Sequence, residues 1–359
     1  MSPLSPLRTF GRYRALLAAG VVLLAAIVVG SITVGAAGSL GVGDALRGLG
    51  ALVGLGAGVE DPQRALIADL RIWRALTAAG VGAALGLSGG LIQGLFRNPL
   101  ASPSLLGVSG GASLGAAIAI AWLGGFGLQS SGFSAGALFV PLASFVGALA
   151  TVTTVALLAS RDGRTSVGAL LLIGIAVNMC VAGGFAAIQS LTLRDFEVSR
   201  AILAWTFGTL EDRSPHHAAI VWGAVVACAA TIPFLARELD LFRGGEADAE
   251  SLGVSVGRVK TLALVAAALS ASAAVAVAGQ IAFVGLVVPH FVRLFAGPGH
   301  GRVLPACVVF GAILLLGADL AQRALFGAAT LQPGVLMSLA GGPFFVLLLV
   351  RHRKEIGAW

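Results

Sequence analysis

The segment IWRALTAAGVGAALGLSGGLIQGL, residues 72–95, decides the fold class of this chain. Most of its residues are apolar or small, and it is long enough for an α-helix to cross a hydrocarbon core of roughly 30 Å. The small residues of its GVGAALGLSGG portion allow neighbouring helices to approach closely. Close packing is also the simplest interpretation of most other glycines in the chain. The segment therefore predicts a membrane-spanning helix surrounded by other helices.

Similar apolar runs recur along the chain, which predicts an all-α integral membrane protein with about ten transmembrane helices. They leave only short loops, so residues 1–359 are predicted to form a single transmembrane domain. The first run follows three arginines, as in a secretory signal, but it is long for a signal core and is predicted to be an uncleaved helix. Pro103, Pro289 and Pro343 fall at or inside short or interrupted spans. The predicted spans are 15–36, 72–95, 104–124, 137–159, 166–190, 216–236, 260–279, 281–296, 303–324 and 336–350.

The composition excludes a water-soluble protein. Apolar residues make up 57% of the chain and charged residues only 11%, against roughly 25% charged in soluble domains. The three cysteines have no paired spacing, so neither a disulfide framework nor a zinc site is indicated. The net charge of +7 does not indicate a nucleic-acid partner, because in a membrane protein the location of the charges matters more than their sum.

The distribution of basic residues predicts the orientation. If the N-terminus is cytoplasmic and ten spans alternate, most of the 23 basic residues fall on the cytoplasmic side. This bias follows the positive-inside rule and predicts that both termini are cytoplasmic. The residues assigned to that side are Arg8, Arg12, Arg14, Arg97, Arg161, Arg164, Arg237, Arg243, Arg258, Lys260, Arg293, Arg302, Arg351, Arg353 and Lys354.

The loop segments 37–71 and 237–260 are the longest. The first is amphipathic in places and is a candidate to lie on the membrane surface. In the second, Gly244 and Gly245 precede three acidic residues, which fits the start of a short helix with acids near its positive end. A turn at Gly253 precedes another brief helical stretch. Two short surface helices that dock a soluble partner, or a solvated connector, both fit this pattern.

Three long segments resemble the signatures of a known family. They are RIWRALTAAGVGAALGLSGGLIQGLFRNPLASPSLLGVSGGASLGA (71–116), GQIAFVGLVVPHFVRLFAGPGHGRVLP (279–305) and LQPGVLMSLAGGPFFVLLLVRHRK (331–354). Together they resemble the permease subunits of ATP-binding-cassette (ABC) importers for iron complexes and cobalamin, in the expected order over nearly the whole chain. The loop ending SLGVSVGRVK falls where that family places its ATPase-docking helices.

The resemblance implies a type II ABC-importer permease fold and a homodimer in the bacterial inner membrane. It also implies two ATP-binding-cassette subunits, a periplasmic binding protein and transport by alternating access. The chain has no Walker-type G-x-x-x-x-G-K-[ST] loop, so ATP with Mg²⁺ is expected to be used by the partner ATPase. No enzyme activity, cofactor or metal is expected in this chain.

The resemblance also implies two sets of contact residues. Arg71, Arg74 and Arg323 match arginines that face glutamates on the binding protein, where rim ion pairs would orient a transient partner. Their alternative role is to anchor helices at the membrane interface. Glu250 stands where the family often has a basic residue, so any ion pair there should differ in sign. The residues expected to contact the ATPase are Glu246, Ala249, Ser251, Leu252, Gly253 and Val254.

Four further polar residues have two interpretations each. Asp319 lies deep in an apolar run, which marks a functional hypothesis, but Arg323 is one turn away, and a structural pair explains it more simply. For His290 a helix-end hydrogen bond is favoured over metal ligation. His216 and His217 are candidates to contact haem in transit, although neighbouring residues on a helix point to different faces.

Other classes of protein fit the sequence less well. An ion-coupled secondary transporter would need ionisable residues at a midplane site, and Asp319 is the single candidate. A membrane enzyme would need a nucleophile with its base or a ligand cluster, and no such constellation is found. Among importer substrates a ferric siderophore is expected first, then haem, then cobalamin.

Overall fold

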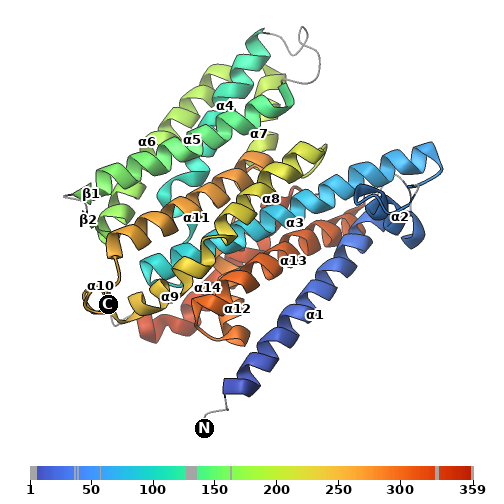
Figure 1. Cartoon of the computed structure of the whole chain (residues 1–359). Coiled ribbons are helices and arrows are strands. Elements are labelled where there is room, and N and C mark those ends of the chain that lie inside the picture. The colour runs from blue at the N-terminus through green and yellow to red at the C-terminus, as the bar shows by residue number, and fades with distance from the viewer. Residues whose placement is uncertain are drawn as a thin grey trace.

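The computed structural model describes residues 6–35, 38, 40–56, 58–126, 136–161, 164–327 and 331–356. These residues form an elongated helical bundle (Figure 1). The short helix α10 (Glu246–Ser251) and the start of α1 (Pro6–Thr33) lie at one end, and α2 (Val42–Leu52) lies at the other. We call these the α10 end and the α2 end.

The segment quoted first forms most of the central helix, α3 (Pro62–Phe96). Asp61 caps its start by accepting bonds from the N–H groups of Gln63 and Arg64, and Pro62 occupies the first turn, where its missing N–H costs nothing. Every residue from 77 to 96 is buried. Helices α8 (Pro215–Ala229), α11 (Val256–Ala278), α12 (Val284–Ala296) and α13 (His300–Phe326) pack around it.

Glycines set the distance between α3 and its neighbours. A Cβ added at Gly82 would lie 2.2 Å from the carbonyl oxygen of Gly311, and one at Gly86 would lie 2.5 Å from that of Cys307. At Gly89 it would lie 1.8 Å from the carbonyl oxygen of Gly285. These helices touch backbone to backbone, as small residues allow in membranes. The close-packing interpretation of these glycines is therefore confirmed.

The remaining helices complete the bundle. Helices α4 and α5 pack against each other and α6 covers α4 on another side, while α14 contacts α12 and α13. A two-residue antiparallel pairing of β1 and β2 closes the turn between α5 and α6. The bounds are η1 (Pro103–Leu106), α4 (Val108–Phe126), α5 (Gly136–Ala159), β1 (Ser160–Arg161), β2 (Arg164–Thr165), α6 (Val167–Thr192), α7 (Phe196–Thr206), α9 (Ile232–Leu241), η2 (Phe242–Gly244) and α14 (Pro333–Ile356).

All ten predicted spans overlap helices, and the all-α membrane class is confirmed. Within the described residues, six helices are long and apolar enough to cross a membrane. The predicted span 216–236 is divided between α8 and α9, which are bent by 53° and form a seventh candidate together. Three other predicted spans coincide with apolar helices of 10–17 described residues. The count of ten crossings remains a prediction.

Several local details differ from the expectations. Helix α7 was not predicted, and α12 and α14 continue through Pro289 and Pro343 without a break. The expected second short helix after Gly253 is the first turn of α11, because the helix that starts at Val256 runs on into the apolar segment. Six of the basic residues assigned to the cytoplasm have side chains outside the described part of the structure: Arg8, Arg161, Arg164, Arg351, Arg353 and Lys354.

Candidate functional site

The α10 end carries a compact exposed tip. Helix α10 begins with Glu246 and Asp248 in its first turn, as predicted, which suits the positive end of a helix. Gly253 adopts a φ of +86°, and the N–H of Val254 donates to the carbonyl of Ala249 at 3.0 Å. This six-to-one bond after a left-handed glycine is a Schellman closure, and it turns the chain directly into α11.

The six residues predicted to contact an ATPase divide into two groups at this tip. Ala249 and Val254 are buried and hold the tip against the core. Ser251 and Gly253 are exposed, and Leu252 between them is 67% exposed. Glu246 forms an ion pair with Lys260 of α11, in which Oε2 and Nζ are 2.6 Å apart. The Lys260 side chain is 7% exposed. The tip therefore presents one exposed leucine, and an ion pair between the buried Lys260 and the 37% exposed Glu246 joins it to α11.

The α2 end carries the three predicted docking arginines, and two of them are buried. Arg71 is 8% exposed and donates to the carbonyls of Ile32, Thr33 and Gly38, so it closes the C-terminal end of α1. Arg323 is 7% exposed and donates to the carbonyls of Ser31 and Val34 at 2.9 and 2.8 Å. Both arginines satisfy carbonyls that the end of a helix leaves unpaired.

Asp319 is the acidic partner of two arginines at this end, Arg323 and Arg74. Its carboxylate is fully buried and pairs with Arg323 at 3.1 Å, as the spacing of one turn predicted. It also pairs with Arg74 of α3 at 2.8 Å, and Arg74 keeps 16% of its side chain exposed. A carboxylate in this position accepts from two cations and is a structural centre for α3 and α13.

The predicted histidines separate as their positions on a helix require. His216 is exposed, whereas His217 is buried and its Nδ1 lies 2.8 Å from the hydroxyl of Ser214 at the start of α8. The ring of His290 packs edge-on against Phe291 and Phe344. Among the described residues, no three His, Cys, Asp or Glu side chains are grouped so that they could hold a metal ion.

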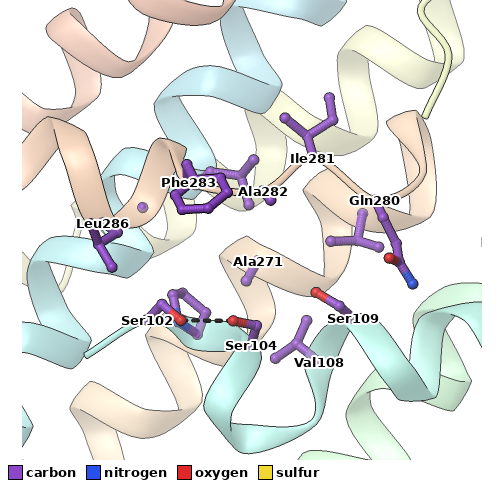
Figure 2. A pocket seen from close by; sticks show the side chains of 14 residues that line it. Ser102, Ser104, Val108, Ser109, Ala271, Gln280, Ile281, Ala282, Phe283 and Leu286 are labelled. Carbon is purple, nitrogen blue, oxygen red and sulfur yellow. Dashed lines mark hydrogen bonds between the residues drawn. The ribbon is translucent and has the colours of Figure 1, made fainter. Parts of the chain in front are cut away.

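A pocket of about 280 Å³ opens where α11 ends and α12 has not yet begun (Figure 2). Leu85, which lines it, is eleven residues from the end of α3, or about 17 Å at 1.5 Å per residue. The pocket therefore lies inside the helical bundle, beside the buried part of α3. The lining residues are Leu85, Ser102, Pro103, Ser104, Val108, Ser109, Ala271, Val275, Gln280, Ile281, Ala282, Phe283, Gly285 and Leu286.

The backbone around this pocket is unusual. Phe283 has a φ of +67°, which side chains other than glycine rarely adopt, and its ring packs on Gly341 of α14. Gly279 also has a positive φ, and an added Cβ there would lie 2.2 Å from the carbonyl of Trp205. Non-helical backbone at membrane depth is tolerated where it is buried in protein or lines a water-filled cavity.

The polar groups of the pocket are neutral. The hydroxyls of Ser102 and Ser104 lie 2.7 Å apart, and Gln280 donates to Ser113 of α4 (Figure 2). None of the described residues that line the pocket is ionisable. The serine hydroxyls and the Gln280 amide can exchange hydrogen bonds with a bound molecule.

Two partly buried polar pairs were missed by sequence reasoning. Arg293 donates to Gln93 between α12 and α3, and His300 binds Asp240 of α9 through its backbone N–H at 2.9 Å and its Nδ1 at 2.7 Å. The partners are far apart in the chain, and although Gln93, Arg293 and His300 lie in the quoted segments 71–116 and 279–305, those segments do not indicate which residues pair. A polar residue inside or at the end of an apolar segment indicates a buried polar contact, but it does not identify the second residue of that contact.

Comparisons with known proteins identify relatives of the chain. The family model for the FecCD transport family matches residues 18–351. The cobalamin import permease of Halobacterium salinarum is 38% identical over 81% of this chain and 75% of its own length. The hemin transport permease of Yersinia pestis is 38% identical over 80% and 84%, and the iron(III) dicitrate permease FecD of Escherichia coli is 37% identical over 80% and 86%.

A solved structure supports the fold as well. A metal-chelate type ABC transporter in an inward-facing conformation matches 94% of this chain and 99% of its own chain, with a TM-score of 0.77 and 26% identity. The fold and the relatives define a multi-pass membrane permease of ABC importers. The chain belongs to the FecCD transport family.

Proposed function

We propose that this permease carries an iron chelate, a ferric siderophore or haem, from a periplasmic binding protein to the cytoplasm. The family match along residues 18–351 is the observation that carries the proposal, and relatives named for hemin, iron(III) dicitrate and cobalamin define the range of cargo. The neutral pocket suits passage rather than capture, because a large chelate must also be able to leave. Specificity then belongs to the binding protein, and cobalamin is the alternative cargo.

The proposed transporter contains two copies of this chain in the inner membrane, with two ATPase subunits. Each copy is a single membrane domain, requires no cofactor of its own, and has both termini in the cytoplasm. In this arrangement the pocket contributes to the pathway. The exposed apolar face of α6, which includes Leu172 and Met179, contributes to the pathway and to the subunit interface.

We propose that the ATPase docks on the Leu252 tip. A leucine that is 67% exposed beyond the end of a membrane helix gains from burial against a partner. Movement of the tip passes through the Glu246–Lys260 pair into α11, whose other end borders the pocket. This connection gives ATP-driven motion a rigid route to the pathway, as alternating access requires.

We propose that the binding protein docks on the α2 end, with Arg74 as the contact among the three predicted arginines. Arg71 and Arg323 direct their guanidinium groups to buried carbonyls, so they shape this surface from below. Arg213 adds positive charge at this end. Partial burial lowers its pKa to about 10, which still leaves it a cation at neutral pH.

The proposal is tested by ATPase stimulation in proteoliposomes that contain the permease and its ATPase. The cognate binding protein is added empty, or loaded with a ferric siderophore, haem or cobalamin, and radiolabelled uptake is measured in parallel. An iron chelate should stimulate hydrolysis and enter the vesicles only with ATP. Uptake that persists without ATP would contradict the importer, and stimulation by cobalamin alone would select the alternative cargo.

A further inference from the structure

A second cavity, which shares no lining residue with the first pocket, lies between α1, α12 and α13. It has a volume of about 250 Å³ and every lining residue is apolar. Residues at positions 287, 288, 291, 292 and 295 form one face of α12 and one wall of this groove, and Leu16 of α1 lies on the opposite side. Phe310, Ile313 and Leu314 of α13 form the floor. Figure 1 shows α1 and α12 flanking α13 near the start of α1.

The groove is open because α1 is less buried than the neighbouring helix α13. Only 17% of the most apolar 18-residue stretch of α1 is buried inside the protein. Gly20 and Gly30 bring it against Val309 and Leu320 of α13. Among the side chains of α1 that the structure describes, Leu16 alone lines the groove. On the α12 side, Phe291 is 43% exposed and Phe295 is 70% exposed. The two exposed phenylalanine rings lie at the rim of the groove. In a membrane protein, such an open apolar groove can accommodate a hydrocarbon chain.

The mouth of the groove at the α10 end is basic. Arg12 is four residues before Leu16, so it lies on the same face of α1 one turn nearer the end, and it is exposed. The guanidinium of Arg302 lies against Gly297, two residues beyond Phe295, since a Cβ built on Gly297 would be 3.3 Å from its Nη2. The hydroxyl of Tyr13 donates to the carbonyl of Arg302 at 3.0 Å and holds the two helices together here.

Negative charge is scarce around this mouth. Residues 1–43 and 281–318 contain no Asp or Glu. Asp240 of α9 approaches Gly299, but its carboxylate accepts bonds from the N–H and the Nδ1 of His300. The Oδ2 of Asp240 and the Nη2 of Arg302 lie 3.7 and 3.9 Å from the same Cβ built on Gly299, so Asp240 is a described carboxylate near Arg302. Arg12 lies on a helix whose sequence contains no acidic residue.

We propose that this groove holds one acyl chain of an anionic phospholipid whose phosphate lies between Arg12 and Arg302. The apolar walls take the chain, and the guanidinium groups suit a phosphate in geometry and charge. Basic residues at a membrane surface favour anionic lipid by about 1 kcal/mol each, or roughly fivefold. The bound lipid fills the space between α1 and α12. The inference depends on the chain lying in a membrane and not on its cargo.

The test is lipid binding to the purified, delipidated permease by native mass spectrometry. The probes are palmitoyl-oleoyl phosphatidylglycerol and the matching phosphatidylcholine. The wild-type protein should retain phosphatidylglycerol preferentially. Arg12→Gln and Arg302→Gln should each reduce that preference about fivefold and leave phosphatidylcholine binding unchanged. Ile313→Trp should fill the groove and remove the retained lipid.

The controls are Arg258→Gln, an exposed arginine at the same end, and Leu157→Trp, an exposed site on α5. Neither should alter lipid retention, and circular dichroism checks that all variants fold. Equal retention of the two lipids by the wild type, or equal losses in variants and controls, would overturn the site. A disulfide between two copies of a Phe295→Cys variant would show instead that a second subunit covers this face. Because the readout is lipid retention, failure here is distinguishable from failure of the proposed transport function.

Discussion

At the scale of single residues, Asp319 has the strongest structural effect at the α2 end. It is fully buried, and its two arginine partners come from α3 and from its own helix α13. Breaking a buried pair by removing one member leaves an uncompensated charge, which costs more than the pair contributes. Asp319 therefore explains why two guanidinium groups are tolerated beside apolar helices.

Replacement of Asp319 by Asn should destabilise the protein by about 3–5 kcal/mol, because Arg74 and Arg323 would lose their counter-charge. Thermal unfolding is measured with a thiol-reactive dye in a Cys180→Ser background, where the buried Cys228 and Cys307 report exposure of the core. Adding Arg323→Gln should recover part of the loss. Unchanged unfolding of the single variant would show that the charge at 319 is not needed.

Replacement of Arg74 by Gln should weaken docking of the binding protein several-fold, with a reduced dependence on salt, because a rim charge mainly steers association. Surface plasmon resonance on nanodisc-embedded permease measures the association rate. Arg47→Gln is the matched control, an exposed arginine on α2. Equal effects of the two substitutions would assign the steering to the whole surface and not to Arg74.

At the scale of elements, the bundle depends on helices that cross at glycines. The contacts of α3 with α12 and α13 at Gly89 and Gly82 leave no room for a methyl group. Because such helices touch through backbone atoms, an added side chain forces the whole element to move. The same closeness places the α11–α12 break, and with it the pocket, beside the central helix.

Gly89→Ala should destabilise the protein by about 1–3 kcal/mol or more, because its Cβ would meet the carbonyl of Gly285. Gly223→Ala on α8 is the control, since nothing lies within 4 Å of its added Cβ; it should be neutral or stabilise the helix by up to about 1 kcal/mol. The dye-based unfolding assay compares them. Equal behaviour would contradict the close crossing of α3 and α12.

Leu252→Asp should reduce co-purification of the ATPase at least several-fold, because a charge would replace the apolar point of the tip. The matched control is Leu193→Asp, which changes an exposed leucine in the turn between α6 and α7. Pull-down from detergent extracts with a tagged permease measures the retained ATPase. Normal retention by the Leu252 variant would place the ATPase elsewhere.

At the scale of the whole molecule, the two ends differ in what they present. The α10 end offers an exposed leucine on a tip that an ion pair joins to α11, whereas the α2 end offers the partly exposed Arg74 beside the buried Asp319 and Arg323. A transporter that receives its cargo on one side and its energy on the other needs such an asymmetry. We propose that the α10 end faces the cytoplasm.

Cysteine labelling tests this orientation. In a Cys180→Ser background, Leu252→Cys should react with a membrane-impermeant maleimide in inside-out vesicles but not in intact spheroplasts. Leu193→Cys should show the reverse pattern, because the turn between α6 and α7 lies at the other end. The opposite pattern for both positions would invert the proposed topology.

The local properties of the sequence were enough to predict the membrane class, the positions of the ten apolar segments and the acidic start of α10. Apolar length and the placement of glycine act over a few neighbouring residues, so a linear pattern contains them. The pair Asp319–Arg323 was predictable for the same reason, since its members are one helical turn apart. The family followed from ordered motifs.

Tertiary structure alone decided which charges are buried and what they contact. Arg71 was predicted to face a partner, yet it closes α1, and Arg74 reaches Asp319 across 245 residues of chain. The bond from His300 to Asp240 and the groove beside α1 have no linear signal either. A sequence gives the chemical type of each side chain, but burial and partner depend on which helices pack together, and packing is a property of the folded bundle.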